Sequence, residues 1–284
     1  MVANAAKYYA DLTAQYRHYG GDACGWHYGV WEADVETHTS ALLRSNEILI
    51  RGLEIKPSTQ ILDVGFGAGG FAVWAAKTWG AQVTGITVCG EHVALARRRA
   101  ARHGVSAQCR FLVMNMDHLA FPTNSFDVVV NQETACYATD KGAYFLELMR
   151  VLRPGGLWRN LDFSIQHAPL SVAQARSYRA VCDGFHIPSL ASLQAITELL
   201  SLTGFDVLEE CDLTTEVLPT AATIRRRCYL PLLMQRAHLD WMVYSRDKES
   251  RSHRRGHILA AHRYSCGLEQ GFLRYIYCSA RKPD

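Results

Sequence analysis

The sequence contains no uninterrupted run of about 18 apolar residues, the length that a membrane-spanning helix needs, so we expect no stable membrane insertion. Residues 1–10 lack the basic stretch followed by an apolar run that marks a secretory signal. The nine cysteines are dispersed from Cys24 to Cys278 and include no Cys-x-x-Cys pair. We therefore expect a cytoplasmic protein with reduced thiols and no metal site built on cysteine.

A strong excess of one sign of charge is also missing. The formal net charge is +3, and charged residues make up 20% of the chain, so we expect no nucleic-acid partner. The short arginine clusters at 97–99, 225–227 and 254–255 are interpreted first as solvated helix faces. The 284 residues suffice for one packed domain with an elaboration, or for two small domains.

Short apolar runs that alternate with helical patterns predict an α/β fold. Candidate strands are 61–64, 83–87, 111–114, 126–130, 157–163, 205–213 and 272–280, and candidate helices include 71–78, 91–103 and 144–152. The Pro154-Gly155-Gly156 sequence ends the last of these helices, because proline cannot continue it and glycine turns the chain. We expect a seven-stranded, mostly parallel sheet of the Rossmann-like kind, covered on both faces.

Two stretches fall outside this alternation. Residues 1–56 precede the first strand and are predicted to form a helical N-terminal cap that is rich in aromatic residues. Residues 57–284 then form the sheet domain, with a helical insertion at about 213–270 between the last two strands. Ligands of such sheets bind outside the carboxyl ends of the strands, so both stretches are candidates for a lid over the site.

A glycine-rich loop follows the first predicted strand. Its Gly65-x-Gly67-x-x-Gly70 pattern fits nicotinamide-binding and methyl-donor-binding loops alike, because glycine lets the backbone turn tightly and approach a ligand. A nicotinamide site needs an acid about 20 residues further on, where this chain has Thr87. Asp63, beside the loop, suits the ammonium group of a methionine moiety and would repel a pyrophosphate. The combination favours S-adenosylmethionine.

The loop resembles motif I of the class I S-adenosylmethionine-dependent methyltransferases. Further matches are Gly85-Ile86-Thr87 at the second strand end, the adenine-contacting pair Asn115-Met116, and the stretches 119–121, 125–127 and 150–156. The resemblance, which runs from about Tyr8 to Pro283, implies an enzyme with the Rossmann-like methyltransferase fold and S-adenosylmethionine as its cofactor. The cofactor-binding residues that we expect are Tyr28, Asp63, Gly65, Phe66, Gly67, Gly69, Thr87, Asn115, Met116 and Gln132.

The segment after the fourth predicted strand faces the methyl group in such a fold, and Glu133 is its candidate catalytic residue. Its neighbours are mostly small or apolar, so the carboxylate should be partly desolvated and more basic than usual. The residues alone leave two other interpretations open. Glu133 could stabilise a helix start, or it could contact the methionine end of the cofactor.

The same segment closely resembles that of the geranyl diphosphate C-methyltransferases, and sterol C-24 methyltransferases are similar there. Both families methylate an isoprenoid alkene. The resemblance to the geranyl diphosphate C-methyltransferases implies that Glu133 is the general base. His27-Tyr28-Gly29 and Asp212-Leu213-Thr214 resemble further stretches of that family. The resemblance thus implies a prenyl diphosphate substrate (isopentenyl, geranyl or farnesyl), a homo-oligomer, and Mg²⁺ as an accessory ion whose ligands the sequence does not identify.

C-methylation of an alkene leaves a carbocation, which aromatic faces stabilise, and a diphosphate group suits arginine. On this basis the expected substrate-binding residues are His27, Tyr137, Trp158, Phe163, Arg225 and Tyr229. Histidines at 253, 257 and 262 share a helix side, but the arginines around them oppose a metal site. The rivals are O- or N-methylation with a histidine base, methylation-triggered cyclisation, and a catalytically silent cofactor-binding subunit.

Overall fold

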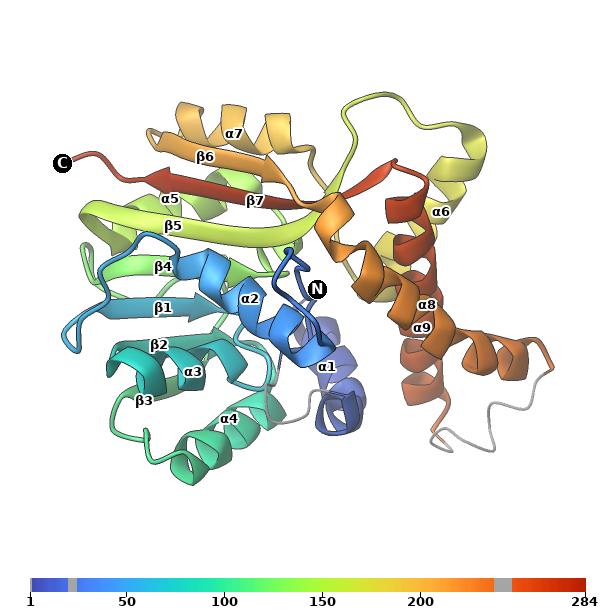
Figure 1. Ribbon diagram of the computed structural model, residues 1–284, viewed down its shortest axis with the longest axis horizontal. Coiled ribbons are helices and arrows are strands. Elements are labelled where there is room, and N and C mark those ends of the chain that lie inside the picture. Colours follow the sequence, from blue (N-terminus) through green and yellow to red (C-terminus); the bar gives the residue numbers. More distant parts are fainter. Residues whose placement is uncertain (1, 20–24, 238–246) are drawn as a thin grey trace.

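The computed structural model describes residues 2–19, 25–237 and 247–284. Within these ranges, seven strands form one sheet in the order β3-β2-β1-β4-β5-β7-β6, in which β7 alone runs antiparallel to its neighbours (Figure 1). The strands are β1 Gln60–Val64, β2 Gln82–Thr87, β3 Cys109–Val113, β4 Phe126–Gln132, β5 Leu152–Ile165, β6 Asp206–Asp212 and β7 Leu273–Arg281. The expected Rossmann-like methyltransferase fold is confirmed.

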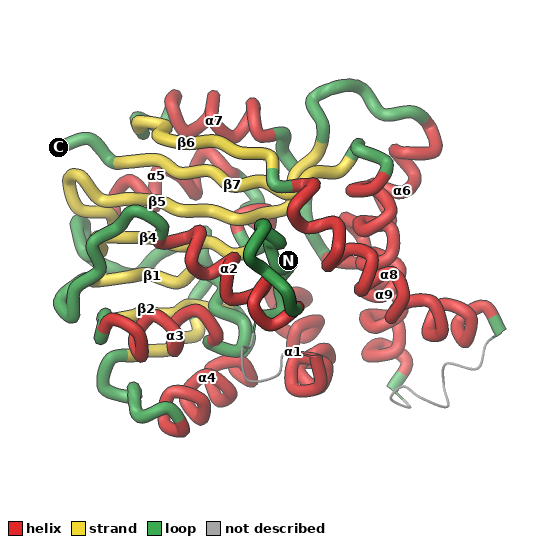
Figure 2. Tube along the Cα trace, viewed as in Figure 1, coloured by secondary structure: helices red, strands yellow, loops and turns green. Residues whose placement is uncertain are grey.

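Helices cover both faces of the sheet. They are α1 Val2–Tyr19, α2 His38–Ile50, α3 Gly70–Trp79, α4 Gly90–Arg102, α5 Lys141–Val151, α6 Val172–Phe185, α7 Leu193–Leu202, α8 Thr214–Arg236 and α9 Lys248–Glu269. Buried side chains of α2, α3 and α4 share one core cluster, and those of α5 and α7 belong to a second cluster behind the sheet (Figure 2).

The central strands are apolar because both of their faces are buried. Ile61 of β1 lies in the first cluster, whereas Leu62, the next residue, lies in the second, as the alternation of side chains along a strand requires. Every residue from Ile61 to Val64 is buried. This packing fixes the carboxyl ends of β1, β2 and β4 relative to one another.

The remaining helices gather at those carboxyl ends. In Figure 1, α8 and α9 extend beyond the strand tips, and α1 lies across the same end of the sheet. The long helix α9 packs against α6, α8 and α1. Residues 238–246 of the expected insertion, like Cys24, lie outside the described residues.

The structure departs from the expected elements in places. Helices α6 and α7 were not predicted, and α5 ends at Val151, so that Leu152 and the Pro-Gly-Gly sequence already belong to the long strand β5. None of the helices in the described ranges combines the length and the hydropathy that crossing a bilayer needs. The eight cysteines in these ranges are free thiols.

Candidate active site

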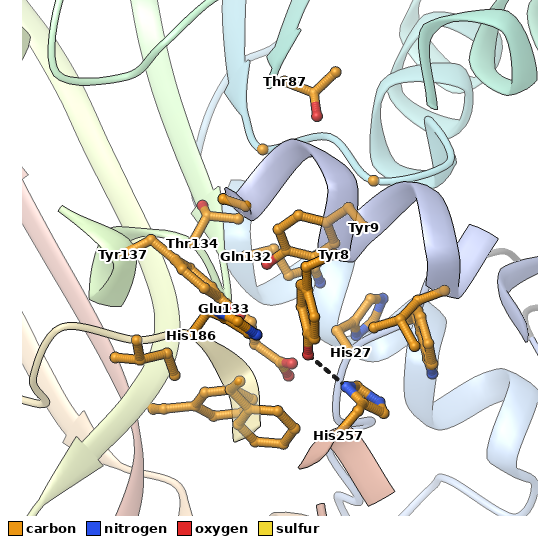
Figure 3. A pocket seen from close by; sticks show the side chains of 18 of the residues that line it. Tyr8, Tyr9, His27, Thr87, Gln132, Glu133, Thr134, Tyr137, His186 and His257 are labelled. Atoms are coloured by element: carbon orange, nitrogen blue, oxygen red, sulfur yellow. Dashed lines mark hydrogen bonds between the residues drawn. The ribbon is translucent and has the colours of Figure 1, made fainter. Parts of the chain in front are cut away.

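A cavity of about 990 Å³ opens where the carboxyl ends of β1, β2 and β4 face the helices (Figure 3). Val64, Thr87 and Gln132, the last residues of these strands, lie in its wall. Helices α1, α6, α8 and α9 each contribute to the opposite wall. Most of the site residues expected from the sequence line this cavity: His27, Tyr28, Asp63, Gly65, Phe66, Gly67, Thr87, Asn115, Met116, Gln132, Glu133, Tyr137 and Phe163.

The glycine-rich loop turns between β1 and α3 with a left-handed backbone. Gly65 has φ of +78° and Gly67 has φ of +54°, a region that glycine occupies without steric cost. A β-carbon at Gly65 would also overlap the Thr134 side chain. Gly69, unlike the other two, does not line the cavity, and a β-carbon there would lie 2.7 Å from Ala96 Cβ. The structure therefore gives Gly69 a role in packing α3 against α4.

Asp63 supplies an unsatisfied carboxylate next to this loop. The side chain is 3% exposed, and its Oδ2 atom is buried without a hydrogen-bond partner among the described residues. Burial raises the pKa of Asp63 to about 7, although the backbone N–H of Ala72 opposes the rise. A buried acceptor that faces a cavity suits a cationic group, so Asp63 fits the ammonium end of S-adenosylmethionine.

The adenosine end of the expected cofactor would meet polar groups, which include Asp117 beside the expected Asn115 and Met116. Thr87 Oγ1 accepts a hydrogen bond from the backbone N–H of Cys89, and Asn115 Oδ1 accepts one from that of Asp117. Both side chains and Met116 lie in the cavity wall. The residues present therefore fit S-adenosylmethionine.

Glu133 follows β4 in a left-handed conformation, with φ of +56°, which is unusual for a residue with a side chain. Its backbone N–H donates to Leu161 O at 2.7 Å, which anchors the residue to β5. Its Oε1 atom accepts the backbone N–H of Tyr28 at 2.6 Å and the Tyr275 hydroxyl at 3.0 Å. Two donors on one oxygen hold the carboxyl group at a fixed place in the cavity wall.

The electrostatic setting of Glu133 makes it basic. Burial raises its pKa to about 8; the hydrogen bonds from Tyr28 and Tyr275 oppose the rise, and the nearby Asp162 adds to it. A carboxyl group with such a pKa exchanges protons close to neutral pH, which suits a general base. The partly buried setting and the raised pKa of Glu133 agree with the sequence-based expectation, while its catalytic role stays a proposal.

An aromatic cluster lies beside Glu133, and Tyr28, Phe163 and Phe185 of this cluster line the cavity. The Tyr28 ring centroid lies 5.7 Å from that of Tyr275 and 5.9 Å from that of Phe163. Phe163 in turn contacts Tyr264 at 4.4 Å and stacks on Phe185 at 5.7 Å. Such faces carry partial negative charge and can stabilise a cation without reacting with it.

Helix α1 closes the cavity through polar contacts with α9. The Tyr8 hydroxyl and His257 Nδ1 share a hydrogen bond of 2.7 Å, drawn dashed in Figure 3, and His253 Nδ1 donates to Asp11 at 2.7 Å. Burial lowers the pKa of His257 to about 4, so its ring is neutral near pH 7. No group of three His, Cys, Asp or Glu side chains in the described part of the chain could hold a metal ion.

Three expected substrate-binding residues do not reach the cavity. Trp158 is fully buried behind the sheet, where its Nε1–H donates to Asn131, because residues 158 and 163 of β5 point to opposite faces. Arg225 forms an ion pair with Glu269 of α9. Tyr229 lies on the outer side of α8 and is 66% exposed.

Other residues take their place. Arg227 and Arg254 line the cavity, as do Tyr8 and His257, and Tyr275 bonds directly to Glu133. Tyr275 carries no sequence signal because it comes from the last strand, in a run of apolar and aromatic residues. Arg227 belongs to the arginine cluster 225–227 that was noted in the sequence. Residues two positions apart lie on nearly opposite sides of a helix, so Arg227 faces the cavity whereas Arg225 does not.

Comparison with known proteins agrees with this geometry. Residues 62–158 match the family model described as a methyltransferase domain. Methyltransferase GfsG of Streptomyces halstedii is 31% identical over 204 residues, which are 70% of this chain and 72% of that protein. The O-methyltransferase resE of Aspergillus sclerotiorum is 31% identical over 71% of this chain and 76% of its own length. Sterol 24-C-methyltransferase ERG6B of Gibberella zeae is 33% identical over 53% of this chain, but over only 41% of its own length.

Solved structures share the fold over nearly the whole chain. The [4+2]-cyclase SpnF superimposes with a TM-score of 0.77 at 23% identity, covering 98% of this chain and 94% of that one. A geranyl diphosphate methyltransferase in complex with GPP and sinefungin gives 0.74 at 19% identity, over 99% and 98%. The geranyl diphosphate C-methyltransferase of Streptomyces coelicolor A3(2), in complex with Mg²⁺, gives 0.71 at 18% identity, over 97% of each chain. At these identities the structures establish the common fold.

Proposed function

This chain belongs to the class I S-adenosylmethionine-dependent methyltransferases, and we propose that it methylates an alkene carbon of an isoprenoid, with Glu133 as the general base. The proposed substrate is a prenyl diphosphate: isopentenyl, geranyl or farnesyl. The observation that carries the proposal is a basic, buried carboxyl group in a cavity wall that is otherwise largely aromatic on that side.

The proposed chemistry uses each of these groups. S-adenosylmethionine supplies an electrophilic methyl group on sulfur. The alkene of the substrate attacks this carbon, so that a C–C bond forms, the C–S bond breaks and positive charge appears on the more substituted alkene carbon. The rings of Tyr28 and Phe163 stabilise that charge. Glu133 then removes a proton from an adjacent carbon, and the C–H electron pair becomes the new double bond.

Two features support a role for Glu133 in the reaction over a structural one. Its left-handed backbone costs free energy, and strain of this kind is often found at functional sites. Asp63 already provides a carboxylate for the ammonium group of the cofactor, so that function does not require Glu133. The carboxyl group is therefore available to the acceptor.

We propose that Arg227 and Arg254 bind the head group, in place of the Arg225 expected from the sequence. Both line the cavity, on α8 and α9 respectively, and guanidinium groups bind phosphate oxygens in a bidentate manner. A structural neighbour binds Mg²⁺ together with geranyl diphosphate, and we propose that Mg²⁺ would accompany the diphosphate group here.

Replacing Glu133 with glutamine tests the general-base role. The variant keeps the size and hydrogen-bond acceptor of the side chain but cannot take the proton, so turnover of the preferred prenyl diphosphate should fall about 10²- to 10⁴-fold. Glu198→Gln, on the exposed surface of α7, is the matched control and should retain full activity. Full activity of Glu133→Gln, with cofactor binding intact, would remove the role.

O-methylation is the second candidate, because five histidines line the cavity: His27, His38, His92, His186 and His257. Burial lowers the pKa values of His27 and His257 to about 4, so both rings are neutral and can accept a proton from a hydroxyl group, but as weaker bases than Glu133. The similarity to the O-methyltransferase resE points the same way. An O–CH₃ signal in the NMR spectrum of the product, with loss of activity in His257→Ala or His27→Ala but not in Glu133→Gln, would establish this candidate.

A further inference from the structure

The outer face of α8 carries an apolar stripe that remains exposed in the described structure. Tyr229, Leu230 and Leu233 are 66%, 64% and 42% exposed. With 3.6 residues per turn these three side chains lie on one side of the helix. Arg226 lies one turn before them and Arg236 one turn after them on the same side, and both are exposed. These five residues are called the outer face of α8.

The opposite side of the same helix belongs to the proposed active site. Ile224, Cys228 and Pro231 line the cavity. Helix α8 is thus a wall with the cavity on one side and the exposed stripe on the other. In Figure 1 it runs beside α9, beyond the strand tips and away from the sheet.

The surroundings of the stripe are cationic. Neither Arg226 nor Arg236 forms an ion pair with any described residue. The acidic residues of α8, of α9 and of the α9 N-cap are Glu216, Asp247, Glu249 and Glu269. Asp247 accepts the backbone N–H of Ser250, Glu249 pairs with Lys7, and Glu269 pairs with Arg225. Among the described residues none of these acids forms an ion pair with Arg226 or Arg236.

An exposed apolar stripe between arginines matches one kind of partner best. A second copy of this chain would place two cationic faces against each other if the same face were used twice, as a twofold dimer requires. A nucleic acid would pair with the arginines but leave the leucines without a partner. An anionic bilayer satisfies both, because apolar side chains enter the boundary between headgroups and acyl chains while arginines bind lipid phosphates.

We propose that the outer face of α8 docks on the surface of an anionic lipid bilayer. Docking places the cavity wall next to the membrane, where apolar acceptors partition. The proposal goes beyond the methyl-transfer function and does not depend on it, because it concerns side chains that do not touch the cavity.

Sedimentation with vesicles tests the docking in the absence of any substrate. The purified chain is mixed with vesicles of phosphatidylcholine alone, or of phosphatidylcholine with phosphatidylglycerol. We expect binding to the anionic vesicles that weakens as salt is added. The combined variant Tyr229→Ser, Leu230→Ser and Leu233→Ser should bind at least about tenfold more weakly, since burial of apolar side chains drives such association.

Matched variants separate docking from general surface effects. Val172, Leu202 and Leu146 are also exposed, at 73%, 84% and 57%, and their combined replacement by serine should leave vesicle binding unchanged. Arg226→Glu with Arg236→Glu should abolish the preference for anionic lipid, whereas Arg176→Glu with Arg179→Glu on α6 should not. Circular dichroism verifies that each variant is folded.

Several outcomes would overturn the proposal. The wild-type chain could stay in the supernatant with anionic vesicles, or the triple serine variant could bind as well as wild type. Light scattering could show that the triple variant converts an oligomer into a monomer while neither form binds vesicles, in which case the face joins copies of this chain. Retention of methyltransferase activity in the triple variant would leave the proposed function standing in each case.

Discussion

Glu133 combines two features that cost a folded protein free energy. A left-handed backbone at a residue with a side chain costs about 1–3 kcal/mol, and burying an ionisable carboxyl group adds to this cost. Both costs are tolerated because Leu161 O, the Tyr28 N–H and the Tyr275 hydroxyl hold the residue in place. Such strain commonly occurs where chemistry takes place.

The pH dependence of the reaction should report the ionisation of Glu133. A general base is active when deprotonated, so at saturating substrate the rate should rise with pH towards about 8 and then level off. The positive sulfur of the cofactor favours the carboxylate and should shift this limb to lower pH in the complex. A turnover rate at saturating substrate that stays constant between pH 6 and about 9 would contradict the assignment.

Tyr275 is a positioning residue whose removal should move that limb. The phenol donates to the ionised carboxyl group, so Tyr275→Phe should raise the pKa of Glu133 and displace the rising limb to higher pH. Turnover at high pH should recover towards the wild-type value. A lower rate with an unshifted limb would mean that Tyr275 acts only through packing.

At the scale of elements, the turn from β1 into α3 shapes the cofactor site. Gly65→Ala introduces a β-carbon that overlaps Thr134 at a left-handed position, so we expect cofactor affinity to fall at least about tenfold. Gly52→Ala is the matched control. Gly52 has nearly the same φ, +76° against +78°, but open space around it.

Calorimetric titration with S-adenosylhomocysteine separates the two glycine variants. Gly52→Ala should lose about 1 kcal/mol of stability from the left-handed backbone and still bind with wild-type affinity. Equal loss of cofactor affinity in both variants would show that strain of the left-handed backbone, and not the overlap with Thr134, lowers the affinity.

The same scale shows what the sequence could and could not predict. Asp63 and Thr87 are polar residues at the carboxyl ends of two predicted strands. They were correctly predicted to line the cavity, because parallel strands place their carboxyl ends at one edge of the sheet. Trp158 and Tyr229 were placed wrongly as cavity residues, since residue type says nothing about which side of a strand or helix faces inward. Tyr275 was missed because its partner is 142 positions away in the chain.

For the whole molecule, the buried carboxyl groups should set the stability of the cofactor-free protein above neutral pH. Asp63 and Glu133 have folded-state pKa values of about 7 and about 8, above their ordinary values of 3.8 and 4.5. Between pH 7.5 and 8.5 these two groups hold more protons in the folded state than in the unfolded chain, so they make the free energy of unfolding fall as pH rises. The lower bound of pH 7.5 keeps the histidines out of this balance. With an ordinary pKa of 6.5 they are only about one-tenth protonated there in the unfolded chain, and burial lowers the folded-state pKa of His27, His92 and His257 to about 4.

Thermal unfolding across this pH range tests the linkage. The melting temperature of the cofactor-free protein should decrease with pH, and S-adenosylmethionine should flatten the decrease because its positive groups favour the ionised carboxylates. Glu133→Gln should also flatten it, by removing one of the two groups. A melting temperature that rises over the same range would contradict the burial of these carboxyl groups.

The most direct measurement of the central proposal is the structure of the product. Purified protein is incubated with geranyl, farnesyl or isopentenyl diphosphate and with S-adenosylmethionine that carries a ¹³C-labelled methyl group, and the product is analysed by mass spectrometry and NMR. The proposal predicts one added methyl carbon bonded to an alkene carbon, with the double bond shifted or re-formed, and no such product from Glu133→Gln. A labelled methyl group bonded to oxygen, or turnover only of acceptors that lack an isoprenoid alkene, would contradict it.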